Sequence, residues 1–215
     1  TTLVIGLPWY AAPDADTFPD YFDFMLYLGA LSERTYLRHA VGAEIFDTLT
    51  LPKLSSQPDD PLAEPTAADY DRLGRLQIAI CNYSRTSLVG KAREMIAASA
   101  LNMQADYILW WDADMRFPYS SFLRLWRHEK PIVAALAFTA REPIFPVVFG
   151  VQALDRVEGD IGEVYEKSSP LFNYPADTLL GDEHVNGWLA TGAGVLLTDV
   201  GVFSEIPKPW FNSTG

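Results

Sequence analysis

Two aspartates separated by one residue, Asp112 and Asp114, directly follow an unbroken apolar run. The run, residues 107–111 (YILWW), has the composition of a buried strand, so it would deliver both carboxylates to its carboxyl end. In an extended segment residues i and i+2 point the same way, so the pair could address one site, although a turn would alter their directions. Carboxylate oxygens suit Mg²⁺ or Mn²⁺, usually together with substrate phosphates and waters. The alternative is a pair of solvated or turn-capping aspartates.

Apolar runs alternate with amphipathic stretches along the first two thirds of the chain, and these elements must position the pair. Short β-branched and apolar runs predict strands at residues 2–7, 44–51, 76–81, 107–111, 132–138 and 147–151. Three- and four-residue apolar spacing predicts helices at residues 18–40, 67–73, 87–102 (with Ser87 as N-cap), 118–128 and 199–205. We read residues 188–197 as one strand interrupted by a glycine kink. This alternation predicts an α/β fold with a central, mostly parallel sheet covered on both faces, whose ligands gather at the carboxyl ends of the strands.

The composition is that of a folded globular protein, 49% hydrophobic and 20% charged. A formal net charge of −12 argues against broad, non-specific binding of nucleic acids, because most of the surface would repel phosphate. No apolar run is long enough to span a bilayer and no signal peptide is visible, although the first residue is Thr1 rather than Met, so a removed leader stays open. The single cysteine, Cys81, predicts a buried thiol in a reducing compartment, and we expect a cytoplasmic protein, in the host cytoplasm if it is viral.

Five motifs in order along the chain resemble the glycosyltransferases of the GT-A fold, in the family-2-like group common in bacteria and their viruses. The segments are residues 5–8 (IGLP), 91–93 (KAR), 105–118 (ADYILWWDADMRFP), 192–197 (GAGVLL) and 202–211 (VFSEIPKPWF). The resemblance implies one three-layer, Rossmann-like GT-A domain over residues 1–215. Its nucleotide-sugar-binding part would cover about residues 1–118, and its acceptor-side part about residues 119–215.

The resemblance also implies a donor site with a divalent cation. Asp114 would ligate Mn²⁺ or Mg²⁺, and Asp112 would lie near the metal or the ribose. Lys91 and Arg93 cannot share a helix face, and the resemblance selects Arg93 as a nucleotide or diphosphate contact; the alternative is an exposed helix cation. The remaining expected donor-binding residues are Pro8, Tyr10, Ala113 and Arg141, with Arg85 as a weaker candidate. For Arg141, the alternative is an ion pair with Glu142 or another acid.

The acceptor side and the catalytic base are less defined. Gly192 and Gly194 would line the acceptor side, and Trp188 and Trp210 could stack on a sugar or pack in the core. In related inverting enzymes a carboxylate after the "PwF" segment serves as general base, but the sequence ends at Gly215 before such a motif. We therefore expect that the natural chain continues or that other residues serve. The visible candidates are Asp182, Glu183 and Asp199, beside a possible metal ligand at His184.

These features favour transfer of a sugar from a nucleoside-diphosphate donor, expected to be a UDP-sugar, to a hydroxyl of a glycan, a protein or a modified DNA base. A nucleotidyltransferase is disfavoured, because the loop after the first strand, residues 6–13, has one Gly and no Lys or Arg. The remaining alternative is a non-catalytic nucleotide-sugar-binding or virion-associated module with the same fold. The base, the sugar and the stereochemical outcome are not specified by the sequence.

Overall fold

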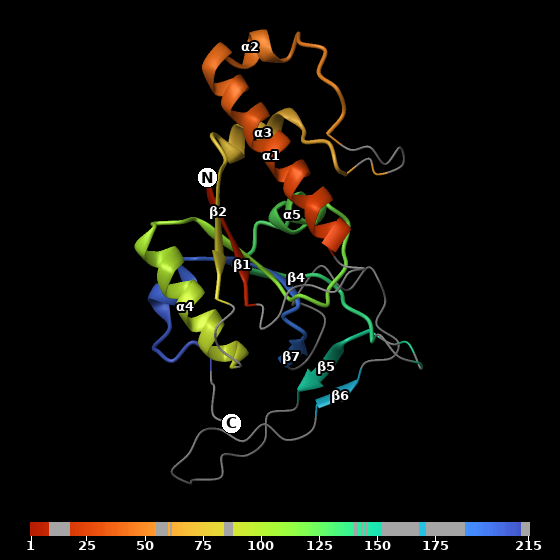
Figure 1. Cartoon of the computed structure of the whole chain (residues 1–215), viewed down its shortest axis with the longest axis vertical. Helices are drawn as coiled ribbons and strands as arrows, with labels where there is room; N and C mark the ends of the chain where they lie inside the picture. The colour runs from red at the N-terminus through yellow and green to blue at the C-terminus, as the bar shows by residue number, and fades with distance from the viewer. Residues whose placement is uncertain are drawn as a thin grey trace. The chain divides into compact units, whose positions relative to one another are not determined.

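The computed structural model describes residues 1–8, 18–54, 60, 62–83, 88–139, 142, 144, 146–151, 168–170 and 188–211 (Figure 1). The chain forms two compact units. The first unit contains Thr1–Val133 and Gly194–Gly215, and the second contains Ala134–Ala193.

An open five-stranded sheet forms the centre of the first unit, in the order β2-β1-β3-β8-β4. Its strands are β1 (Thr2–Leu7), β2 (Gln77–Asn82), β3 (Tyr107–Trp111), β4 (Ile132–Ala134) and β8 (Val195–Asp199). Strand β1 pairs in parallel with both β2 and β3, whereas β8 pairs antiparallel with β3. The α/β class is therefore confirmed, and the expected mostly parallel sheet is instead a mixed one.

Six helices are described in the first unit: α1 (Phe18–Val41), α2 (Ala43–Phe46), α3 (Ala67–Leu73), α4 (Val89–Asn102), α5 (Ser121–Trp126) and α6 (Val202–Glu205). The predicted strand at residues 44–51 is wrong. Gly42, with φ of 85°, ends α1, and the chain then forms the short helix α2. Its residue Phe46 packs edge-on against Tyr70, so a local apolar run meets a helical neighbour rather than a strand.

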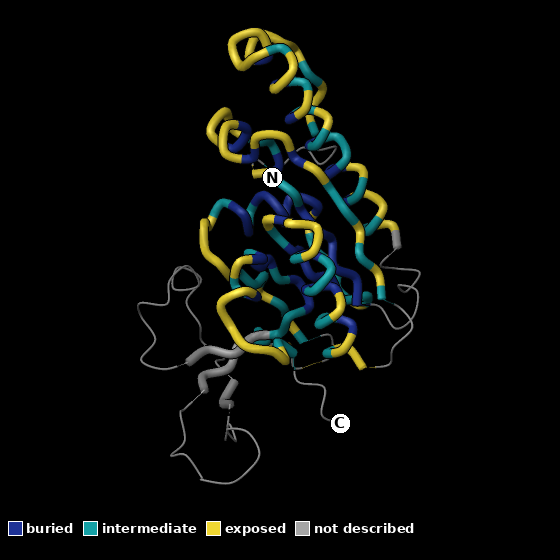
Figure 2. The backbone as a smooth tube through the Cα atoms, turned by 90° about the vertical axis from the view of Figure 1, so that its left-hand side faces the viewer, coloured by how far each residue is buried: buried dark blue, intermediate teal, exposed yellow. Residues whose placement is uncertain are grey.

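Neighbouring tryptophans of β3 pack on opposite faces of the sheet, because successive side chains of a strand alternate. Trp110 joins a buried cluster with Ile96 of α4 and Phe203 of α6. Trp111 contacts Phe24 of α1, with ring centroids 5.1 Å apart. Helices α4 and α6 therefore cover one face, and α1 covers the other. The buried residues of the first unit are concentrated in the strands between these helices (Figure 2).

Helix α1 crosses its face of the sheet diagonally. Near its middle, the Ser32 hydroxyl donates to the carbonyl of Leu76, just before β2 (2.7 Å). Near its start, Phe24 packs on Trp111 at the end of β3. This course leaves Ile80 of β2 half exposed, at 51%.

Three antiparallel strands are described in the second unit, in the order β6-β5-β7: β5 (Val148–Val151), β6 (Ser168–Pro170) and β7 (Trp188–Thr191). The predicted single kinked strand at residues 188–197 is wrong. Strand β7 belongs to this sheet and β8 to the sheet of the first unit. Gly192 and Ala193 lie between the two strands.

Candidate functional site

The carboxyl ends of three parallel strands meet at one edge of the first unit. Leu7, the last residue of β1, pairs with Asn82 of β2, and Gly6 pairs with Trp110 of β3. Continuing this register places Pro8 beside Asp112. Pro8, an expected donor residue, is buried.

The chain leaves β1 and β2 toward opposite faces of the sheet. After β1 it continues to α1, and after β2 it continues to α4, which covers the other face. The chain thus passes from β1 to β2 on one side of β1 and returns to β3 on its other side, so the strand order reverses at β1 and β3, where ligands of open α/β sheets bind. Both connections, residues 9–17 and 84–87, lie outside the described residues, and with them the predicted residues Tyr10, Arg85 and Ser87.

The two aspartates lie in a turn that closes directly after β3. The amide of Met115 donates to the carbonyl of Asp112 (3.1 Å), and the indole Nε1 of Trp111 donates to the carbonyl of Met115 (3.0 Å). The amide of Asp112 donates to the carbonyl of Gly194 (2.9 Å), which extends the β3–β8 ladder by one residue. Asp112 and Asp114 are therefore not successive same-face residues of an extended strand, and the half-buried Ala113 lies in the turn between them.

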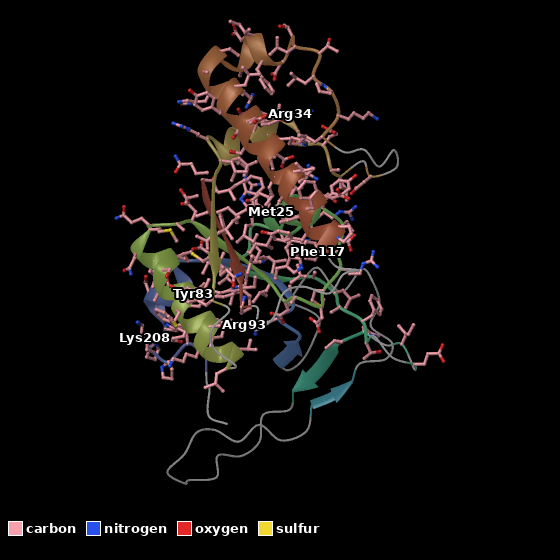
Figure 3. All side chains as sticks on the ribbon, viewed as in Figure 1. Met25, Arg34, Tyr83, Arg93, Phe117 and Lys208 are labelled. Atoms are coloured by element: carbon pink, nitrogen blue, oxygen red, sulfur yellow. The ribbon has the colours of Figure 1, made fainter. Side chains whose placement is uncertain are left out.

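Arg93 of α4 forms an ion pair with Asp112. Its Nη2 donates to both carboxylate oxygens, at 2.8 Å to Oδ1 and 2.9 Å to Oδ2. The Arg93 side chain is 15% exposed and that of Asp112 is 31% exposed. The alternative of an exposed helix cation is therefore wrong for Arg93, because its guanidinium lies at the predicted edge, near the carboxyl end of β1 (Figure 3). The neighbour Lys91 is exposed.

The position of Arg93 follows from the packing of α4. Ile96, Ala97 and Ala100 are buried in the cluster against β1 and β3. Gly6 of β1 allows this close approach, because a Cβ there would lie 3.1 Å from Ile96 and from Trp110. The adjacent residue Glu94 accepts hydrogen bonds from the amides of Trp210 (2.9 Å) and Phe211 (3.1 Å), which fastens the chain after α6 to α4.

Asp114 is exposed and differs from Asp112 in its surroundings. Within the described residues, its carboxylate has no hydrogen-bond or ion-pair partner. Arg93, Asp112 and Asp114 together carry a formal charge of −1. Among the described residues, this edge therefore has one carboxylate without a paired cation, Asp114, and one that Arg93 neutralises, Asp112.

Gly194 is the expected acceptor-side residue that the structure brings to this turn. A Cβ at Gly194 would lie 2.7 Å from Cγ and 2.8 Å from Sδ of Met115, so a larger residue here would force the Met115 side chain to move. Gly192, in the second unit, has only an ordinary contact with Val147, at 3.6 Å. Trp188 starts β7, and its side chain lies outside the described part.

Asp199 lies at the opposite edge of the sheet. It pairs with Tyr107, the first residue of β3, whereas Asp112 follows the last. Its carboxylate accepts a hydrogen bond from the amide of Gly201 (2.7 Å) at the start of α6. Asp199 therefore does not belong to the edge that holds Asp112.

The structure does not describe four of the predicted residues: Arg141, Asp182, Glu183 and His184. The aromatic pair Trp210 and Phe211 packs against the cluster of α4 and α6, so the described rings are structural. The contact of Glu94 with this segment was not predicted, because the partners are 116 and 117 residues apart and no local pattern joins them.

The described residues contain no group of three or more His, Cys, Asp or Glu side chains that could hold a metal ion. Mg²⁺ is commonly held by one or two carboxylates together with substrate phosphates and waters, and two carboxylates in one turn meet that lesser requirement. Among the described helices, none is long and apolar enough to cross a bilayer.

Comparisons of this chain with models of protein families, with curated proteins and with solved structures found no match.

Proposed function

We propose that this chain is a glycosyltransferase of the GT-A type, which transfers a sugar from a nucleoside diphosphate to a hydroxyl acceptor. The observation that carries the proposal is the Arg93–Asp112 ion pair with Asp114 beside it, at the carboxyl ends of β1 and β3. An arginine and two carboxylates at this edge combine a group that recognises phosphate with hard oxygen ligands for a cation. The ordered motifs of the sequence add the GT-A resemblance.

Asp114 is the proposed principal metal ligand, since it is exposed and without a partner among the described residues. Asp112 is the second carboxylate, held in place by Arg93 and by its backbone bond to Gly194. Bound Mn²⁺ or Mg²⁺ would act as a Lewis acid toward the charge on the departing nucleoside diphosphate. The guanidinium of Arg93 would add a second positive charge near the same phosphates.

The donor is proposed to be a UDP-sugar and the acceptor a glycan, a protein or a modified DNA base. Pro8, directly after β1, would lie near the base. From the resemblance, Trp188, Gly192 and Gly194 are proposed for the acceptor side. The general base is not assigned, because Asp199 lies at the other edge.

A thermal-shift screen with UDP, GDP and CDP, each with and without Mn²⁺, tests this proposal. A ligand that binds only the folded state stabilises it by about 2.7 kcal/mol at a hundredfold excess over its Kd. We expect one nucleotide to raise the Tm in a metal-dependent way, and the Asp114→Asn variant to lose that shift.

The matched control is Asp23→Asn, which removes the same charge from an exposed position on α1. This variant should keep the wild-type shift. A shift that survives in Asp114→Asn contradicts the metal assignment, and no shift with any nucleotide contradicts the donor site. Nucleotide binding without sugar transfer would instead support a non-catalytic module.

A further inference from the structure

The guanidinium of Arg93 occupies the carboxylate oxygens of Asp112 to which a metal ion would otherwise bind. Its Nη2 contacts both carboxylate oxygens at 2.8 and 2.9 Å. This contact uses one nitrogen rather than the two parallel bonds of a fork, so it satisfies the carboxylate charge without the most specific arginine–carboxylate geometry. A divalent cation bound by Asp112 would lie close to this positive charge.

The arginine of this pair is better shielded from water than the carboxylate. The Arg93 side chain is 15% exposed and that of Asp112 is 31% exposed, and the helix of Arg93 is packed through Ile96 and Ala97. Charges in such a position interact more strongly than exposed ones and are less screened by salt. The repulsion between Arg93 and a metal ion is therefore substantial while Arg93 stays on Asp112.

Asp114 cannot compensate for this repulsion alone. With Arg93 and Asp112 neutralising each other, it supplies the one net negative charge of the three residues. An exposed carboxylate gives a divalent cation few ligands, since such ions need further oxygens from phosphate or water. The edge should thus bind metal weakly without an anionic ligand.

We propose that Arg93 is a counter-ion of Asp112 that couples the binding of the metal ion and of the nucleotide at this edge. Its positive charge weakens metal binding until the diphosphate of a nucleotide binds. This inference rests on the proposed function. A diphosphate offers the guanidinium a more highly charged partner than Asp112, and a change of the long Arg93 side chain can move it from one to the other. Asp112 then gains free oxygens for the metal. Because such coupling is reciprocal, the metal must strengthen nucleotide binding by the same factor as the nucleotide strengthens metal binding.

The test measures Mn²⁺ bound to the full chain by water-proton relaxation, with no nucleotide and with millimolar UDP, GDP or CDP. For the wild type we expect weak Mn²⁺ binding alone and a gain of at least about tenfold with one nucleotide, the lower part of the usual range for coupled sites. Arg93→Gln should bind Mn²⁺ alone at least about tenfold more tightly, the same coupling seen from the metal side, and should lose most of the gain from the nucleotide.

Two further variants keep the result interpretable. Arg93→Lys retains the charge and should keep metal binding weak in the absence of nucleotide. Lys91→Gln removes the same charge from an exposed position on the same helix and should behave as the wild type. Circular dichroism on each variant shows that it is folded.

The outcomes separate this inference from the proposed function. If the wild type gains Mn²⁺ affinity from a nucleotide but Arg93→Gln shows the same two affinities, the counter-ion role is overturned and the donor site stands. If no nucleotide changes Mn²⁺ binding in any variant, the donor site itself is overturned. Tighter Mn²⁺ binding in Lys91→Gln, equal to that of Arg93→Gln, would also overturn the specific role of Arg93.

Discussion

Two arginine–aspartate pairs in the first unit have similar distances and different surroundings. Arg127, which directly follows α5, donates to Asp69 of α3 at 2.7 Å, and Arg93 donates to Asp112 at 2.8 Å. The Asp69 side chain is 6% exposed, and it also accepts hydrogen bonds from the amide and the hydroxyl of Thr66. The Asp112 side chain is 31% exposed, and the nearby Asp114 has no partner among the residues that the structure describes.

The difference shows what each pair is built to do. Asp69 completes a capping box at the start of α3 and joins that helix to α5, so its acceptor positions are committed to the fold. Asp112 ends a strand at the edge where open α/β sheets bind ligands. Its carboxylate is held in place from one side and remains reachable by solvent. The first pair is committed to the fold, and we propose that the second belongs to a ligand site.

The largest effect is expected at Asp69. The change Asp69→Asn removes the partner of Arg127 and weakens the capping box, and breaking a shielded pair from one side costs about 3 kcal/mol. Urea unfolding monitored by circular dichroism measures this loss. Asp71→Asn is the control on the same helix: its side chain, which pairs with Arg38, is 67% exposed, so we expect at most about 1 kcal/mol.

Lowering the pH should reduce the contribution of Asp69 to the unfolding free energy, measured by the same urea unfolding. Burial alone would raise the pKa of Asp69, but hydrogen bonds from Arg127 and Thr66 outweigh it, and this pKa lies below its usual value. The stabilisation is therefore complete above the unfolded-state pKa, near 3.9, and is lost as the pH falls through the lower folded-state pKa. The unfolding free energies of wild type and Asp69→Asn should converge as the pH is lowered below about 4. A constant difference over that range would contradict this assignment.

A smaller effect is expected at Asp112. Asp112→Asn removes the charge that faces Arg93 but leaves the amide bond to Gly194, and a partly exposed pair contributes about 1 kcal/mol. The same urea experiment gives the comparison with Asp69→Asn. A loss as large as that of Asp69→Asn would show that Asp112 is mainly structural.

The smallest effect on stability is expected at Asp114. Its carboxylate is exposed and has no partner in the described part of the chain, so Asp114→Asn should change the unfolding free energy by less than about 0.5 kcal/mol. The variant should still lose the metal-dependent shift with nucleotide. If Asp114→Asn lost both stability and ligand binding, Asp114 would have a structural role, and its contrast with Asp69 would fail.

The local parts of this structure could be predicted from the sequence. Strands 2–7 and 107–111 and helix 67–73 match the structure residue for residue, because their apolar spacing and ends are local features. The structure places Arg93 beside Asp112, whereas Lys91 is exposed, and the role of Arg93 as a nucleotide contact stays a prediction.

Features set by partners distant in the sequence could not be predicted. Residues 188–197 form two strands because each finds its neighbour in a different sheet. The turn at Asp112 depends on contacts with Trp111 and Gly194, and the attachment of Trp210 to α4 depends on Glu94. The spacing of residues in the sequence does not indicate these contacts.

A crystal structure with Mn²⁺ and the nucleotide selected by the thermal-shift screen would test the central claim most directly. The anomalous signal of manganese locates the metal independently of the protein density. We predict one peak within ligand distance of an Asp114 oxygen, about 2 Å, with the nucleotide's phosphates on the metal. A bound nucleotide whose metal lies away from Asp112 and Asp114, or that binds at another edge of the sheet, would contradict the account.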